Sequence, residues 1–413
     1  MTNPKTGTRK PQEPQMIFHS LSPELAAQLR AAVNGQIEHV RRFRRALHQI
    51  PEKSMEEHKT SGLIQTELTD IGLPFEAGLA GTGIAADLDT GREGGYVVLR
   101  SDMDALPICE TTGVPYHSRH EGYAHSCGHD GHAAVLLGVA RVLTAWKDRL
   151  KGRIRFIFQP AEELARGAQE MIEAGVLCGR KPDAIFALHG WPGLETGHVA
   201  CRGGTMMAAC DSFEVTIVGR GGHGARPHLA CNPLQALAPI SDKFLHMNSD
   251  TRVVSPCIMR VGDKNNVIAD RGTLAGSLRT LDHATRELTM REMHEVAEKI
   301  AISHGARAEV SFETGCPRVE SHSACYELFV ETAAHLLGDE AVHVLDHSSM
   351  GSEDFGFYLE HVPGLMFRLG VGENSPELHN SAFNFNDEAL PGGMLTLAGL
   401  ALRVAGYSEK ADR

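Results

Sequence analysis

Three short apolar segments in the first half of the chain each end in a cluster of polar residues. They are YVVLRSDMDALP at 96–107, RIRFIFQPAEE at 153–163 and AIFALHG at 184–190. Apolar runs of this length with polar boundaries predict buried strands. The intervening segment GHAAVLLGVARVLTAW at 131–146 has apolar residues at helical spacing. A strand, helix, strand order predicts an α/β fold with a largely parallel sheet and helices on both faces.

The pattern changes at about residue 205. Strand-like and helix-like segments now follow the order β, α, β, β, α, β, at 211–220, 232–247, 255–262, 270–280, 283–305 and 306–315. This order is the split unit of a ferredoxin-like domain. After this region, a helix-like segment at 323–338 and a strand-like segment at 364–372 resume the alternation of helices and strands found before residue 205. We therefore predict a catalytic domain made of residues 16–204 and 317–413, interrupted by an inserted ferredoxin-like lid domain at 205–316.

Composition narrows the class of protein. The chain has 413 residues and a formal charge of -12, which predicts two domains and argues against nucleic acid or an anionic membrane as the main partner. No apolar run is long enough to span a membrane, and the polar, proline-rich residues 1–15 predict a disordered arm on a cytoplasmic protein. The nine cysteines have no regular spacing. We expect most of them to be buried apolar residues and not disulfide-bonded.

The polar clusters follow the predicted strands, where α/β sheets bind their ligands. In HSCGHDGH at 125–132, Cys127 and His129 can face one ion, which would be Zn²⁺, or Mn²⁺, Co²⁺ or Ni²⁺ if carboxylates complete the set. Adjacent Glu162 and Glu163 can divide two tasks, because one can bind metal while the other deprotonates a water. Taken alone, each stretch has a structural alternative, such as a buried cysteine or a solvated helix start.

Further polar residues follow the same strands. His189 comes directly after a strand, and His379 lies in a loop far downstream. Asp102 and Asp104 could supply a ligand, orient a ligating imidazole, or only cap backbone amides in a turn. Together these side chains converge on one edge of one predicted sheet, which favours a shared site.

The chain resembles a known family in a series of ordered motifs. The motifs are LRSDMDALP, HSCGHDGH, FQPAEE, ALHGWP, GGHGARPH, NVIAD, GSLRT, SEDFGFY and ELHNSAFNFND. They occur in this order in the metal-dependent amidohydrolases that include hippurate hydrolase, indole-acetyl amino acid hydrolases and bacterial N-acyl-L-amino acid amidohydrolases. The dimetal aminoacylases and carboxypeptidases are their relatives, and the resemblance runs from about residue 44 to the C-terminus.

The resemblance implies a centre of two divalent metal ions that a thiolate bridges, held by Cys127, His129, Glu163, His189 and His379. Glu162 matches the general base, and Asp104 would hold a metal-binding side chain in position without binding the metal itself. His223 would reach the active site of a partner subunit and steady the oxyanion, which implies a homodimer or higher oligomer through the lid. Asn266 and Arg279 match positions that contact the substrate. The implied reaction splits the amide bond of a small N-acyl-L-amino acid into a carboxylic acid and a free amino acid.

One residue departs from the wider group. Aminoacylase and carboxypeptidase relatives carry a metal-binding histidine where this chain has Asp102, so Asp102 is left out of the ligand set. Three alternatives stay open: a dipeptidase or aminoacylase with another acyl preference, a catalytically silent metal-binding or ligand-binding relative, and a redox or acyl-transfer enzyme that uses Cys127. The base at Glu162 argues against the second, and the lack of a nearby second cysteine argues against the third.

Overall fold

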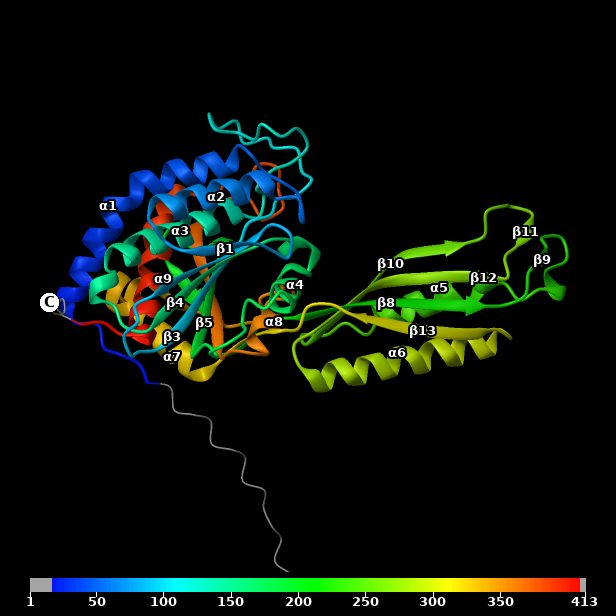
Figure 1. Ribbon diagram of the computed structural model, residues 1–413. Coiled ribbons are helices and arrows are strands. Elements are labelled where there is room, and N and C mark those ends of the chain that lie inside the picture. The colour runs from blue at the N-terminus through cyan, green and yellow to red at the C-terminus, as the bar shows by residue number, and fades with distance from the viewer. Residues whose placement is uncertain (1–16, 409–413) are drawn as a thin grey trace, which may run out of the picture.

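The computed structural model describes residues 17–408, which form a large body and a projecting lid (Figure 1). The arm predicted at 1–15 lies outside the described residues. The body is built around an eight-stranded sheet of order β1-β2-β4-β3-β5-β16-β6-β15. Its strands are β1 (Phe75–Leu79), β2 (Gly83–Asp89), β3 (Tyr96–Asp102), β4 (Arg153–Gln159), β5 (Ala184–Pro192), β6 (Val199–Cys201), β15 (Val342–Val344) and β16 (Gly364–Gly372).

The middle of this sheet is parallel. Strand β3 pairs in parallel with both β4 and β5, and β16 pairs in parallel with β5. The edges depart from this direction, because β1 with β2, β2 with β4, and β6 with β16 are antiparallel. The prediction of a largely parallel sheet is therefore confirmed for the four central strands β4, β3, β5 and β16, the first three of which end in the polar clusters.

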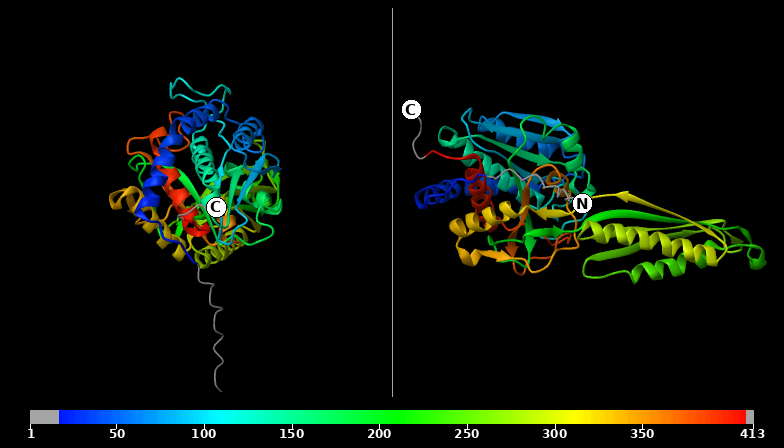
Figure 2. Two further views of the ribbon diagram at one scale, coloured as in Figure 1. Left: turned by 60° about the vertical axis from the view of Figure 1, so that its left-hand side comes forward. Right: turned by 90° about the horizontal axis from the view of Figure 1, so that it is seen from below.

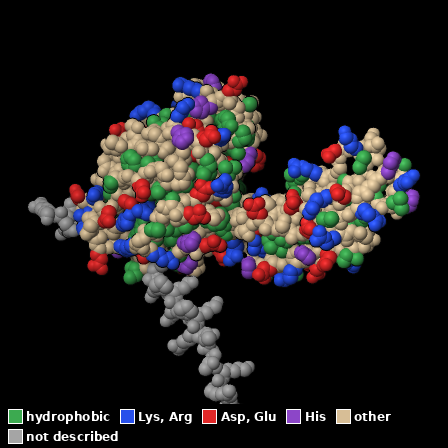
Figure 3. Space-filling view, turned by 45° about the vertical axis from the view of Figure 1, so that its right-hand side comes forward, with side chains coloured by type: hydrophobic (Ala, Val, Ile, Leu, Met, Phe, Trp, Pro, Cys, Tyr) green, Lys and Arg blue, Asp and Glu red, His purple; other side chains and the backbone are tan. Residues whose placement is uncertain are grey.

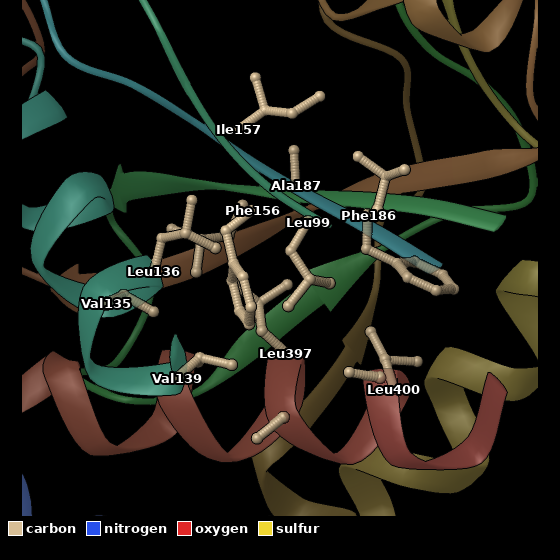
Figure 4. Packing of buried hydrophobic residues seen from close by; sticks show 14 of the residues in the cluster. Leu99, Val135, Leu136, Val139, Phe156, Ile157, Phe186, Ala187, Leu397 and Leu400 are labelled. Atoms are coloured by element: carbon tan, nitrogen blue, oxygen red, sulfur yellow. The ribbon is translucent and has the colours of Figure 1, made fainter. Parts of the chain in front are cut away.

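Long helices cover one face of the sheet, and shorter ones lie on the other face near the lid. Figure 4 shows how Leu99, Phe156 and Phe186 of the strands meet Val139 and Leu400 of two of these helices. Burial of such side chains removes apolar surface from water and stabilises the layered fold. The helices are α1 (Pro23–His48), α2 (His58–Asp70), α3 (His129–Ala145), α4 (Gly167–Glu173), α7 (Ser323–Leu337), α8 (Gly356–Leu359) and α9 (Leu390–Ala405).

The lid has its own antiparallel sheet and its own core. The sheet has the order β10-β12-β8-β13, and its core includes Phe213, Leu237, Phe244 and Met293. The elements follow as β8 (Ala209–Val218), α5 (Pro233–Leu245), β10 (Arg252–Val261), β12 (Arg271–Thr280), α6 (His283–Ser303) and β13 (Arg307–Thr314). This is the predicted β, α, β, β, α, β order. Figure 2 shows both helices on one side of a sheet that extends away from the body.

Two small sheets complete the chain. Strand β7 (Gly204–Met207) pairs with β14 (Val319–Ser321) where the lid leaves the body, and β9 (Gly222–His223) pairs with β11 (Val267–Ile268) at the far end of the lid. Between residues 17 and 408 no helix is both long and apolar enough to span a membrane. Figure 3 shows charges of both signs interspersed on one face of body and lid.

The expectation that most cysteines would be buried is wrong. Only Cys127, Cys201, Cys316 and Cys325 are buried, whereas Cys109, Cys178 and Cys257 are exposed and the other two are intermediate. A cysteine tolerates exposed positions as a small residue, so its type alone does not predict burial at a given site.

Candidate metal centre

The first turn of α3 and the turn after β4 carry the central residues. Gly128, with φ of +90°, turns the chain sharply between Cys127 and the start of α3 at His129. A side chain at Gly131 would lie 2.3 Å from Cδ2 of Phe385, so glycine allows this turn to pack closely on that ring. Ala161, with φ of +54°, begins the turn that holds the glutamates. Left-handed backbone at a non-glycine residue is costly and is common at functional sites.

The five proposed ligands lie close to one another. Cys127 Sγ is 3.4 Å from His189 Nε2, and His379 Nε2 is 3.5 Å from Glu163 Oε1. Of the residue groups whose ligand atoms all lie within 4.8 Å of each other, two contain Cys127, namely Cys127 with His129 and His189, and Cys127 with Glu163 and His379. Cys127 is the shared member, as expected for a thiolate that bridges two ions.

The residues fit a divalent metal. His129 Nε2 and Glu163 Oε1 are buried and have no hydrogen-bond partner among residues 17–408, although buried polar atoms are normally paired. His129 Nε2 lies 3.9 Å from both Glu163 Oε1 and Glu162 Oε2. Thiolate, imidazole and carboxylate together suit Zn²⁺ and similar ions. These orphaned atoms therefore indicate that the cluster is built to hold a cation.

Asp104 organises the cluster from behind. Its carboxylate accepts from His129 Nδ1 at 3.1 Å and from the backbone N–H groups of Glu162 and Glu163 at 3.2 and 3.1 Å. Ser54 donates a further hydrogen bond of 2.7 Å. Because Nδ1 of His129 carries the proton, its Nε2 faces the cluster with a free lone pair. One carboxylate thus orients a histidine and the glutamate turn together.

Asp102 and His132 satisfy each other. His132 Nδ1 donates to Asp102 Oδ1 at 2.7 Å, and His132 Nε2 accepts from the backbone N–H of Gly190 at 2.7 Å. The other oxygen of Asp102 accepts from Arg100 at 2.9 Å. Asp102 and His132 lie close enough to His129 to form a possible ion-binding group, but their donors and acceptors are already in use. This pairing supports leaving Asp102 out of the ligand set.

The surroundings adjust the proton affinity of the central groups. Burial, reinforced by the neighbouring carboxylates Glu353 and Asp354, raises the pKa of Glu162 well above its usual value. Burial lowers the pKa of His189, which favours the neutral imidazole that metals bind. Burial also raises the pKa of the Cys127 thiol, which argues against a free nucleophilic thiolate.

Sequence reasoning gave no role to a buried charge cluster beside Glu162. Arg100 donates to Asp102 at 2.9 Å, to Glu353 at 3.0 Å and to Asp354 at 2.8 Å. Glu353 and Asp354 also come within 4.8 Å of the Glu162 carboxylate. The signals were present in LRSDMDALP and SEDFGFY, but nothing in either motif shows that the two segments meet.

The three predicted site residues of the lid lie at opposite ends of that domain. His223 pairs with Val267 at the far end, where Asn266 accepts a backbone hydrogen bond of 2.8 Å from Gly224 (Figure 1). Arg279 lies at the end of the lid nearer the body and donates to Met350 O at 2.9 Å. Within one chain, the structure therefore brings Arg279 toward the segment before Glu353 but leaves His223 and Asn266 away from the metal cluster.

Asp104→Asn is expected to weaken metal binding by about 10-fold to 100-fold, a typical effect of losing a residue that supports a ligand. The asparagine amide can turn an N–H donor toward the backbone N–H groups of Glu162 and Glu163, which donate to the Asp104 carboxylate in the wild-type protein. Competition with a chelator measures the affinity. Asp211→Asn is the matched control, because Asp211 is equally buried but pairs with Arg286 of the lid. Equal metal affinity in the Asp104 variant and the control would contradict the supporting role.

Comparison with known proteins gives matches along most of the chain. The family profile described as Peptidase family M20/M25/M40 matches residues 98–403. N-acetylcysteine deacetylase of Bacillus subtilis (strain 168) is 36% identical over 369 residues, which cover 88% of this chain and 96% of that protein. Hippurate hydrolase of Campylobacter jejuni is 32% identical over 368 residues, which cover 88% of this chain and 95% of that protein.

A solved structure agrees in fold. The YXEP protein of Bacillus subtilis, described as a dinuclear metal binding peptidase from the M20 family, superposes with a TM-score of 0.80 at 34% identity. The match covers 89% of this chain and 98% of that one.

Proposed function

The chain belongs to peptidase family M20/M25/M40, and we propose that it hydrolyses the amide bond of N-acyl-L-amino acids, releasing a carboxylic acid and a free amino acid. Relatives named as a hippurate hydrolase and an N-acetylcysteine deacetylase support this substrate class. The single observation that carries the proposal is the convergence of two ligand groups on Cys127, with Glu162 beside them. Metal-assisted hydrolysis needs this combination of a metal site and an adjacent base.

The proposed centre takes two divalent ions per subunit, of Zn²⁺, Mn²⁺, Co²⁺ or Ni²⁺. Cys127, His129 and His189 would hold one, and Cys127, Glu163 and His379 the other, since these groups have converging ligand atoms. When bound, such ions lower the pKa of a water and polarise a carbonyl oxygen. His379 has the most exposed side chain of the five at 53%, so the second group lies nearer to solvent.

Glu162 is the proposed general base. Its carboxylate oxygen faces the cluster without ligating either group, and its side chain is only 11% exposed. It would accept a proton from the attacking water and later deliver it to the leaving nitrogen. Burial and the carboxylates of Glu353 and Asp354 raise its pKa, which brings it nearer to the working pH where a base is most efficient.

Substrate contacts are proposed to come from both subunits of a dimer. Arg279 would clamp the α-carboxylate, a role that suits a bidentate guanidinium. Strand β10 is a free edge of the lid sheet within the described residues, and it exposes Ile258 and Met259 by 44% and 40%. An exposed apolar edge strand is a ready surface for pairing with a second copy. Such pairing would let His223 and Asn266 serve the partner subunit's site.

Mixing two inactive variants tests the shared site. His223→Ala and Glu162→Gln proteins should each be nearly inactive, whereas exchanged dimers should regain about a quarter of the wild-type activity, since half of them are heterodimers with one complete site. The measurement is turnover after subunit exchange, with exchange verified by mass. Failure to recover activity in verified heterodimers would contradict the contribution of His223 across subunits.

The decisive test of the proposed function is turnover by metal-reconstituted enzyme on N-benzoyl, N-acetyl, indole-acetyl and long-chain acyl amino acids. We expect release of the free amino acid from at least one series, because the base and both ligand groups are present. Faster turnover of dipeptides assayed beside this panel would favour the dipeptidase alternative. Zero turnover across the panel, with metal bound, would favour the silent binding protein.

A further inference from the structure

One buried cation near the candidate metal centre has no anionic partner between residues 17 and 408. Arg368, on β16, is 9% exposed, and no hydrogen bond or ion pair from that part of the chain reaches its guanidinium. Of its three nitrogens only Nε is sealed from solvent, so the two terminal nitrogens still face accessible space. Burial lowers the pKa of Arg368 to about 10, which leaves it charged at neutral pH.

The other two buried arginines differ in this respect. Arg44 bonds Asp130 at 2.9 Å and Asn384 at 2.7 Å, and Arg100 is held by three carboxylates. Both therefore have structural partners that offset the cost of burying a charge. Arg368 lacks any such partner among the described residues. A buried cation with its terminal nitrogens left open is what a binding site for an anion requires.

The position of Arg368 relates it to the proposed ligands. Strands β16 and β5 pair in parallel with Arg368 opposite His189, so these two side chains leave the same face of the sheet. Their neighbours Leu369 and Leu188 point to the other face, where both approach Gly393 of α9. The Trp191 ring joins the two, since its centroid is 3.6 Å from Arg368 Cζ and 5.7 Å from the His189 ring.

The stacked pair of Arg368 and Trp191 is chemically suited to bind a carboxylate. An indole that stacks on the face of a guanidinium leaves the edge with the terminal N–H groups free, and that edge matches the two oxygens of a carboxylate. We propose that Arg368, backed by Trp191, binds a second carboxylate of the substrate, in addition to the α-carboxylate assigned to Arg279. This inference rests on the proposed function. The second carboxylate would belong either to an acidic amino acid or to a dicarboxylic acyl group.

Two pairs of substrates distinguish these sources. N-acetyl-L-glutamate is compared with N-acetyl-L-glutamine, and N-succinyl-L-alanine with N-butyryl-L-alanine. Metal-loaded wild-type enzyme should favour the charged member of one pair by about 10-fold to 100-fold in kcat/KM, the range expected for a charged hydrogen bond. Arg368→Gln should abolish this preference, because it lowers kcat/KM for the charged member toward that for the neutral member. Arg368→Lys should retain part of the preference, because the charge remains.

Arg149→Gln is the matched control. Arg149 also stacks on an aromatic ring, with Cζ 4.6 Å from the Tyr407 centroid, but it lies outside the proposed site. It should keep the wild-type preference. No preference in the wild-type enzyme would overturn the proposal while leaving the amidohydrolase function intact. An equal loss on charged and neutral members in Arg368→Gln would also overturn it, since that result indicates a structural role or the α-carboxylate.

A binding measurement separates this inference from the proposed function. Calorimetry on the metal-loaded protein compares L-glutamate with L-glutamine, and succinate with butyrate. Wild-type protein should bind one dicarboxylate at least about 10-fold more tightly than its neutral match, and Arg368→Gln should not. If no substrate turns over but this difference is present, the function fails and the subsite stands. If the difference is absent as well, both proposals fail.

Discussion

Glu162→Gln is expected to lower kcat by about 10²-fold to 10⁴-fold, the contribution of a positioned general base. Glutamine keeps the shape of the side chain but cannot accept the proton of the attacking water. Metal content should stay near normal, because the proposed ligand groups that share Cys127 do not include Glu162. Steady-state kinetics and metal analysis on the same preparation measure both quantities.

Glu163→Gln is the matched control for this variant. The two glutamates are adjacent and their side chains are similarly buried, at 11% and 12% exposure. Only Glu163 belongs to a proposed ligand group with Cys127 and His379. The Glu163 variant should therefore lose metal, whereas the Glu162 variant should not. Near-normal turnover in Glu162→Gln would show that another group acts as the base.

Cys127→Ala is expected to weaken the binding of both metal ions by more than about 100-fold, because removing a direct ligand should cost at least as much as removing a residue that supports one. Cys127 belongs to both proposed ligand groups, so its loss leaves each group one ligand short. His379→Ala should weaken only one ion. Chelator competition with measured stoichiometry distinguishes one affected ion from two.

Cys325→Ala is the control for the change in size. Cys325 is also buried, but it lies on α7 in the hydrophobic core. It should change stability without changing metal affinity. If Cys127→Ala binds both ions with wild-type affinity, the bridging thiolate is wrong and the cysteine is only a small buried residue.

The pattern of apolar residues predicted the middle of the body well. The segments at 96–107, 131–146 and 153–163 became β3, α3 and β4, with ends within a few residues of those expected. Periodicity succeeds here because each element is long enough to show its repeat. Strands β6 and β15 have only three residues each, and pairing with neighbours decides them. No repeat can be read from three residues.

The candidate site shows the same division. Metal-binding residue types follow the predicted strands, and parallel strands place their ends at one edge, so the convergence of Cys127, His129, Glu163 and His189 was accessible from the sequence. The contacts that hold these side chains in position could not be identified from the sequence. Arg100 meets Glu353 across 253 positions of sequence, and Asp104 meets the backbone of Glu162 across 58. Such contacts depend on how loops close over the sheet.

The sequence by itself therefore determined the parallel core, the order of elements in the lid and the family to which the chain belongs, because these follow from local periodicity and from motifs of fixed spacing. Only the tertiary structure decided which charges are paired. Arg100 and Arg368 each follow a run of apolar residues in a strand, yet one is surrounded by carboxylates and the other stacks on Trp191 with its terminal nitrogens open. Their difference lies in what other segments bring to the same face of the sheet, and that depends on the packing of the whole chain.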